Sequence, residues 1–114
     1  MNEFVTFKRW TLKDHQLEPD LVTLIREGIV PMYAKLPGCR KIGLLRIDGT
    51  CSYLATQHWE SRDSYDTVTS SSFYQEWFKI YEPALKRWDD LMSLEEEWES
   101  EEISLYEISN LQLQ

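Results

Sequence analysis

Two runs in which apolar and polar residues alternate lie on either side of Asp48-Gly49. They constrain the fold more than any other part of the chain. They span Cys39 to Asp48 and Cys51 to Glu60. An Asp-Gly pair between such runs predicts a β-hairpin, because a type I′ turn needs positive φ at both central residues. The second strand ends at Trp59, and Ser61 then offers a helix N-cap. Strand, cap and helix follow one another here, so we expect any pocket at this junction.

One strand and one helix are predicted before the hairpin. Glu3 to Trp10 alternates and carries large apolar residues on both faces, which is typical of a strand covered on both sides. Pro19 suits a first helical turn, and apolar residues recur at helical spacing from Leu21 to Leu36. Pro31 lies inside this helix, so a kink or break is expected there.

A broken helix and a last strand are predicted after the hairpin. Ser61 caps a short helix to about Thr69, and a capping box of Ser72 and Gln75 starts a second piece, which Pro83 should bend. Ile103 to Ile108 alternates and predicts the last strand, with Trp98 as an alternative start. The second piece has the clearest helical periodicity in the chain, with apolar residues at Phe73, Trp77, Ile80, Tyr81, Ala84, Leu85, Trp88, Leu91 and Met92.

The order of elements predicts an α+β, ferredoxin-like β-α-β-β-α-β domain over residues 1–114. It has a four-stranded antiparallel sheet, both helices on one face, and a broken second helix. Several strands carry apolar side chains on both faces, and two helices can cover only one of them. A second subunit that places its sheet against the bare face resolves this conflict, so we expect a homodimer closed into an α+β barrel.

Composition excludes several classes of function. The chain has 114 residues and a formal net charge of -8, which argues against nucleic acid and anionic membrane surfaces as partners. The acidic run from Glu95 to Glu102 predicts a solvated loop or a strand edge. No apolar run approaches the about 20 residues of a membrane span. Cys39 and Cys51 flank the hairpin and could meet across it, although free thiols in a reducing cytoplasm are favoured.

The residues that close the hairpin carry a family resemblance. Trp59-Glu60-Ser61, followed by Tyr65 and Phe73 in a broken helix, resembles the antibiotic biosynthesis monooxygenase type of dimeric α+β barrel, from about Phe4 to Ile108. A similarity to the NIPSNAP-like branch rests on Thr11-Leu12-Lys13, Glu27-Gly28-Ile29-Val30-Pro31, Trp77 and Pro83-Ala84-Leu85. The superfamily includes cofactor-free oxygenases, haem-degrading enzymes, isomerases and proteins without known activity, so the resemblance implies a fold more firmly than a function.

The haem-degrading members of this superfamily supply a specific test. They use an asparagine on the first strand, a tryptophan that closes the third, and a histidine one turn past the phenylalanine of the second helix. Trp59 matches the tryptophan, but Lys8 stands at the asparagine position and Trp77 at the histidine position. Without that histidine the iron has no axial ligand. The comparison disfavours haem degradation, and we expect no cofactor.

Candidate site residues are few. His58 is the one side chain that could act as a general base near neutral pH, although a lone strand histidine is more often structural. Trp59 could contact a planar ligand or anchor the core. Aromatic residues at helical spacing are usually core, but several could also wall a pocket: Tyr65, Phe73 and Trp77, and with them Tyr33, Tyr53, Tyr74, Tyr81 and Trp88. The other side chains that would suit an aromatic or quinone-like ligand are Lys8 and Gln57. Two distant histidines without neighbouring Cys or Asp predict no metal site.

Two hypotheses from different classes therefore remain open. The first is a homodimer with one small hydrophobic pocket per subunit that acts as a cofactor-independent monooxygenase, as the resemblance implies. The second is a non-catalytic, small-ligand-binding or structural homodimer of the same fold. A cavity lined by a titratable group would favour the enzyme, whereas a filled interior would favour the scaffold.

Overall fold

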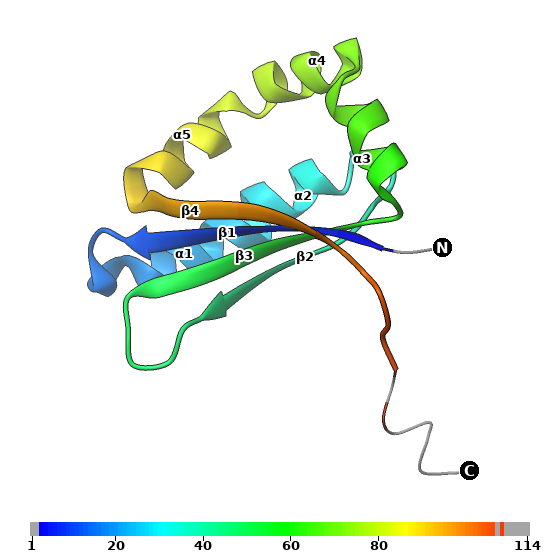
Figure 1. The fold of residues 1–114 in the computed structure, drawn as a ribbon. Coiled ribbons are helices and arrows are strands. Elements are labelled where there is room, and N and C mark those ends of the chain that lie inside the picture. Colours follow the sequence, from blue (N-terminus) through cyan, green and yellow to red (C-terminus); the bar gives the residue numbers. More distant parts are fainter. Residues whose placement is uncertain (1–2, 107, 109–114) are drawn as a thin grey trace.

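The computed structural model describes residues 3–106 and 108 of the chain (Figure 1). Its elements follow the predicted β-α-β-β-α-β order. The strands are β1 (Phe4–Leu12), β2 (Cys39–Arg46), β3 (Ser52–Trp59) and β4 (Met92–Glu101). The helices are a 3-10 turn (His15–Leu17), α1 (Glu18–Leu24), a π-helical segment (Ile25–Ile29), α2 (Val30–Tyr33), α3 (Arg62–Thr69), α4 (Ser72–Ile80) and α5 (Glu82–Leu91).

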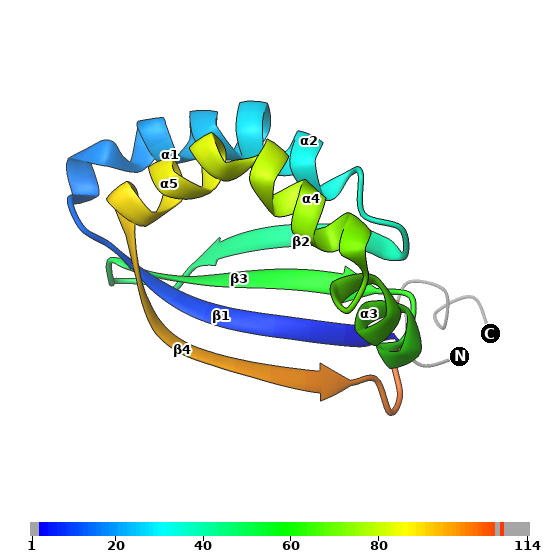
Figure 2. The same ribbon diagram turned by 90° about the horizontal axis from the view of Figure 1, so that it is seen from above.

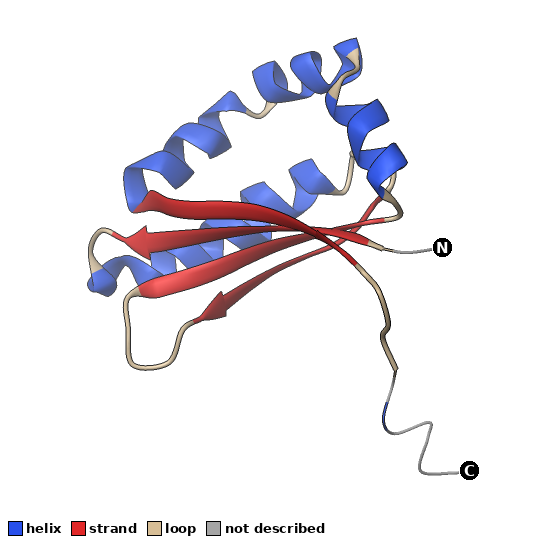
Figure 3. Ribbon diagram, in the orientation of Figure 1, coloured by secondary structure: helices blue, strands red, loops and turns tan. Residues whose placement is uncertain are grey.

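The four strands form one antiparallel sheet in the order β2-β3-β1-β4. The helices lie on one face of it, as Figures 2 and 3 show. This confirms the predicted α+β, ferredoxin-like class. The main core lies between the sheet and the helices. Its fully buried members are Phe4, Ile29, Met32, Leu36, Trp59 and Trp77.

The first helix breaks where Pro31 predicts, and it does so through a π-helical segment. The backbone N–H of Val30 donates to the carbonyl of Ile25, five residues back. Pro31 then occupies the first turn of α2, where its missing N–H costs nothing. Short π-helical segments are frequent at functional sites. Here the segment borders the cavity described below.

The second helix is in three pieces, and the cap of the middle piece differs from prediction. Ser61 caps α3 as expected, accepting from the N–H of Ser64 at 3.1 Å. The cap of α4 is Ser71, which accepts from the N–H of Tyr74 at 3.2 Å, so the Ser72 and Gln75 capping box is wrong by one residue. Three serines in a row offer the same hydroxyl at three positions, and the sequence pattern does not choose among them.

The apolar stripe of this helix is only partly buried. Trp77, Leu91 and Met92 are in the core, but Phe73 is 47% exposed and Ile80 is 68% exposed. The break at Pro83 confirms the predicted bend, since α4 ends at Ile80 and α5 begins at Glu82. The break rotates α5 relative to α4, so residues at continuous helical spacing do not share one face.

The hairpin is present, but its turn is wider than predicted. Ile47 N–H donates to the carbonyl of Ser52 at 2.9 Å, which leaves four loop residues between them. Gly49 has a φ of 75°, whereas Asp48 does not have positive φ, so the type I′ turn is wrong. Cys51 lies at this end of the hairpin and Cys39 begins β2 at the other, so the two cysteines do not meet across it; both thiols are free.

The last strand begins and ends earlier than predicted. β4 spans Met92–Glu101 and pairs with β1, so it contains most of the acidic run. Of the two alternatives for that run, a strand edge is the one observed. Ile103 to Tyr106 lies beyond the strand with its large side chains exposed, and residues 107 and 109–114 lie outside the described part. The acidic run forms a strand although glutamate has a low strand propensity. It can do so because it pairs with β1 and because the acidic side chains of an edge strand can reach solvent.

The sheet face opposite the helices carries apolar side chains. Strand alternation and register place Phe7, Leu45, Leu54 and Trp98 there, and we call these four residues the open face. The rings of Phe7 and Trp98 stack with centroids 5.6 Å apart. Leu45 is 61% exposed and Trp98 is 43% exposed. Arg9 shares this face, and its buried Nε has no hydrogen-bond partner among the described residues.

A cluster of three side chains ties the first helix to the hairpin and supports a pH-dependent prediction. Tyr53 Oη and Arg46 donate hydrogen bonds to Glu18, with Arg46 Nε at 3.1 Å from Glu18 Oε2. The hydrogen bond from Tyr53 and then that from Arg46 lower the pKa of Glu18. A carboxylate with a depressed folded-state pKa stabilises the fold above its unfolded-state pKa and loses that contribution as the pH falls through its folded-state value.

Glu18→Gln is therefore expected to lower the free energy of unfolding at pH 7 and to have little effect at pH 2. The difference should shrink as the pH falls below roughly 4.3, the ordinary pKa of glutamate. Urea unfolding of both proteins at a series of pH values measures it. Asp20→Asn is the control, because it removes a charge from the same helix without removing these hydrogen bonds. A difference that persisted unchanged at pH 2 would contradict the role given to the ionised carboxylate.

Candidate functional site

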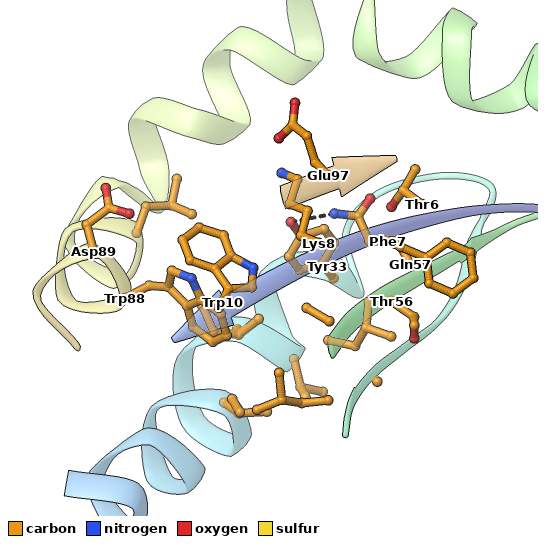
Figure 4. A pocket seen from close by; sticks show the side chains of 18 of the residues that line it. Thr6, Phe7, Lys8, Trp10, Tyr33, Thr56, Gln57, Trp88, Asp89 and Glu97 are labelled. Atoms are coloured by element: carbon orange, nitrogen blue, oxygen red, sulfur yellow. Dashed lines mark hydrogen bonds between the residues drawn. The ribbon is translucent and has the colours of Figure 1, made fainter. Parts of the chain in front are cut away.

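A cavity of about 1100 Å³ lies between the sheet and the helices. Its floor is the helix-facing side of β1, β2 and β3, and its walls come from the first helix, α3, α4 and α5 (Figure 4). The apolar part of the lining includes Trp10, Ile25, Ile29, Ile42, Leu44, Leu85 and Trp88. Apolar walls with a few converging polar groups are typical of sites for small organic molecules.

Four polar side chains from different elements meet in this cavity. Lys8 projects from β1 and Gln57 from β3, while Tyr33 comes from α2 and Tyr65 from α3. Lys8, Tyr33 and Gln57 lie close to one another in Figure 4, where the dashed line joins Gln57 to Tyr33. The strand residues face inward because Lys8 and Gln57 share the side of the sheet that carries Phe4 and Trp59.

A chain of hydrogen bonds runs from the core into the cavity. Trp59 Nε1 donates to Gln57 Oε1 at 3.0 Å, and Gln57 Nε2 donates to Tyr33 Oη at 3.0 Å. The Tyr33 ring packs edge-on against Trp77 with centroids 5.3 Å apart. Trp77 is itself fixed by a hydrogen bond of 2.6 Å from its Nε1 to the carbonyl of Met32. Both ends of the chain are therefore held by buried tryptophans.

Carboxylates border the cavity on the side of β4. Glu97 pairs with Lys8 across the β1–β4 ladder, and Glu99 pairs with Thr6. Both line the cavity, as does Asp89 from α5. The cavity thus has negative charge along one side and the donor groups of Lys8 and Gln57 toward the middle of the sheet.

The tyrosines of the cavity are protonated at neutral pH. Burial raises the pKa of Tyr33, Tyr65 and Tyr74 above the ordinary value of a phenol. For Tyr65, the carboxylate of Glu99 adds to the effect of burial. These hydroxyls can donate hydrogen bonds, and none is a thermodynamically accessible base near pH 7.

The predicted site residues separate into four locations, and the fourth, that of His58, is described in the next paragraph. Lys8, Gln57 and Tyr65 line the cavity. Trp59 and Trp77 are in the core, where Trp59 packs edge-on against Tyr65 with centroids 5.2 Å apart. Phe73 lies on the outer surface of α4 and is 47% exposed.

His58 lies on the other face of the sheet. Its Nδ1 is 2.6 Å from Glu3 Oε1, and both side chains are about three quarters buried, with 22% and 25% exposed. Strand alternation places it opposite Trp59, as its position in the sequence predicts. His15 is in the exposed 3-10 turn. In the described part of the chain, neither histidine lines the cavity.

Sequence reasoning did not single out Tyr33, Glu97 or Glu99 as site residues. Tyr33 appeared only as one of many aromatics, because its contact with Gln57 spans 24 residues. Glu97 and Glu99 belong to the acidic run, which the sequence alone predicts to be a solvated loop or a strand edge. Once that run is a strand, every second glutamate faces the cavity, so alternation would have identified them.

The described residues form neither a metal-binding cluster nor a membrane-spanning helix. No group of three or more His, Cys, Asp and Glu side chains is placed to hold a metal ion there. No helix in residues 3–106 is long and apolar enough to cross a membrane.

Comparison with solved structures finds the same fold in several proteins of low sequence identity. HapK from Hahella chejuensis is 13% identical with a TM-score of 0.67, covering 94% of this chain and 98% of its own. SnoaB, a cofactor-independent oxygenase from Streptomyces nogalater, is 15% identical with a TM-score of 0.58, covering 95% and 98%. An ethyl tert-butyl ether degradation family protein from Bacillus halodurans is 17% identical with a TM-score of 0.58, covering 90% and 100%.

Sequence comparison identifies the family. None of the curated proteins matches this chain significantly. The sequence profile of the antibiotic biosynthesis monooxygenase family matches residues 4–80, which is more than half of the chain and includes β1, the hairpin, α3 and α4. The chain therefore belongs to the antibiotic biosynthesis monooxygenase family.

Proposed function

We propose that this chain is a cofactor-independent monooxygenase that acts on a small aromatic or quinone-like molecule in the cavity between sheet and helices. In such a reaction the ligand is an ionised, electron-rich molecule that reacts with O₂ directly. The ligand supplies all four electrons that reduce O₂: one oxygen atom replaces two hydrogens at the reacting carbon, and the other leaves with those hydrogens as water. The protein binds the ligand, stabilises its ionised form and keeps bulk water from the reacting carbon.

The cavity is the observation that carries this proposal. Its volume of about 1100 Å³ and its aromatic walls suit a molecule of several fused rings. Lys8, Gln57 and Tyr65 supply a positive charge and hydrogen-bond donors within apolar surroundings, where each polar contact is stronger than in water. SnoaB, a cofactor-independent oxygenase, shares this fold at 15% identity.

One observation favours the second candidate, a non-catalytic binder of the same fold. His58, the candidate general base, is paired with Glu3 on the face away from the cavity. An enzyme built on this cavity therefore needs a ligand acidic enough to release its proton to solvent. A binding protein has no such requirement.

Oxygen uptake distinguishes the two candidates. Anthrone is a suitable fused-ring probe, because its enolate is electron-rich and reacts with O₂. With an oxygen electrode, the enzyme should raise the uptake well above the rate in buffer, without added metal or reductant. Tight binding of anthrone with uptake equal to that in buffer would establish the binding protein instead.

Ala55→Phe should block the cavity. Ala55 lines the floor and lies opposite Lys8 on the neighbouring strand. A phenyl group there occupies ligand space, and we expect anthrone affinity to fall at least about tenfold while thermal stability changes little. Isothermal titration calorimetry and thermal unfolding measure the two effects. Ala34→Phe, at an exposed position after α2, is the control. Unchanged binding in Ala55→Phe would place the ligand elsewhere.

We also propose that the working unit is a homodimer in which two open faces pack together into an α+β barrel. The open face holds four large apolar side chains that the chain itself leaves partly exposed. Glu96, which contacts Arg9 at 3.6 Å, shares this face, so a two-fold partner offers acidic groups to basic ones.

A further inference from the structure

The two hydrogen bonds around Gln57 fix the direction in which Tyr33 can donate. An indole N–H is a donor only, so the Gln57 atom that faces Trp59 must be the carbonyl oxygen. The amide nitrogen then faces Tyr33, and an amide nitrogen can only donate. Tyr33 Oη must accept that bond, so its own proton points elsewhere.

The free proton of Tyr33 has no other acceptor in the described chain. Gln57 is the one hydrogen-bond partner of the Tyr33 hydroxyl among residues 3–106. Tyr33 lines the cavity, and its ring is clamped against Trp77. The hydroxyl is therefore a pre-oriented donor at the cavity wall. Because it is already held in place, it loses little conformational entropy when it binds a ligand atom.

The charges around the cavity determine which kind of ligand atom accepts the hydrogen bond of Tyr33. Lys8 adds a positive charge near Tyr33, and its cross-strand partner Glu97 lies beside it on β4, with Glu99 two residues further along that strand. A negatively charged ligand oxygen is attracted toward Lys8 and Tyr33 and repelled from β4. A ligand with one ionised oxygen and a flat apolar body then has a single favoured orientation.

We propose that Tyr33 holds an ionised oxygen of a phenolic or enolic ligand, and that Trp59 and Gln57 turn its proton toward that oxygen. This inference rests on the proposed function and names its substrate class. The ligand enters as the neutral phenol or enol and loses its proton to solvent. The hydrogen bond from Tyr33 and the charge of Lys8 stabilise the anion that remains. Tyr33 is a contact residue, and Trp59 and Gln57 are positioning residues.

The probe for this inference is 2-hydroxyanthraquinone, whose anion absorbs in the visible, with 2-methoxyanthraquinone as a non-ionisable partner. Titrating the bound probe with pH gives its apparent pKa in the cavity. The wild type should lower that pKa relative to water by about one to two units. In Tyr33→Phe the shift should shrink by about one unit, and affinity for the anion should fall about tenfold. Affinity for the methoxy compound should stay the same.

Two further variants make the test specific. Tyr74→Phe removes another cavity-lining hydroxyl and should leave the shift of the probe unchanged. Gln57→Met should reduce the shift although Tyr33 keeps its hydroxyl. If Gln57 acts through Tyr33, the double variant Tyr33→Phe/Gln57→Met shows the same shift as Tyr33→Phe alone. A further, additive loss in the double variant would overturn the positioning role of Gln57.

The outcomes separate this inference from the proposed function. If both probes bind and the shift survives in Tyr33→Phe, the role of Tyr33 is overturned while the cavity remains a binding site. If the wild type binds neither probe, the proposed site itself is overturned. Circular dichroism and thermal unfolding of Tyr33→Phe test for a folding defect, because the variant keeps the packed ring but loses the acceptor of the Gln57 amide.

Discussion

Trp59→Ala is expected to lower the free energy of unfolding by about 3–5 kcal/mol. Trp59 is 1% exposed and packs against Tyr65 in the main core. Removing the indole leaves a cavity that the rigid end of β3 cannot close, because Gly38 holds the adjoining turn. Gly38 has a φ of 83°, and its carbonyl accepts from the N–H of Glu60 at 2.8 Å.

Urea unfolding of Trp59→Ala measures this loss of stability, and two further variants serve as comparisons. Trp59→Phe keeps most of the apolar contact and loses the donor to Gln57, so we expect a loss of about 1–3 kcal/mol from the unpaired amide oxygen. Trp98→Ala removes a tryptophan that is 43% exposed and should cost less than Trp59→Ala. Equal losses in Trp59→Ala and Trp98→Ala would contradict the anchoring role of Trp59.

The parts of the fold that could be predicted from the sequence rest on local signals. The cap at Ser61 and the breaks at Pro31 and Pro83 follow from single residues whose backbone chemistry is unambiguous. Strand alternation correctly separated Gln57 and Trp59 from His58. Each of these inferences depends only on residues within about one helical turn or one strand pleat, so the local sequence is enough to make it.

The errors arise where several local solutions are equivalent and a distant contact chooses between them. The acidic run and Ile103 to Ile108 are both compatible with a strand, and pairing with β1 selects the first. Ser71 and Ser72 are equally good caps, and packing of α4 selects Ser71. The cavity polar cluster could not be assembled either, because Lys8, Tyr33 and Gln57 come from three elements.

Replacing Leu45 and Trp98 together by Glu is expected to convert the proposed dimer into a folded monomer. These residues stand on β2 and β4, the two edge strands of the sheet. Wherever the two-fold axis crosses the open face, at least one of them lies in the contact. A buried, unpaired carboxylate in each copy is costly, so the dimer dissociation constant should rise about 100-fold or more. Both side chains are partly exposed in the monomer, so its fold should survive.

Sedimentation velocity at micromolar concentration measures the change, with Ile80→Glu as the control. Ile80 is 68% exposed on α4, on the helix side, so the same substitution there should leave the dimer intact. A double variant that dimerises as tightly as the wild type would place the interface elsewhere, and a monomeric wild type would contradict the dimer. The cavity lies on the helix side of the sheet. The monomeric variant should therefore still bind 2-hydroxyanthraquinone, because each copy carries the Lys8, Tyr33 and Gln57 cluster within its own chain.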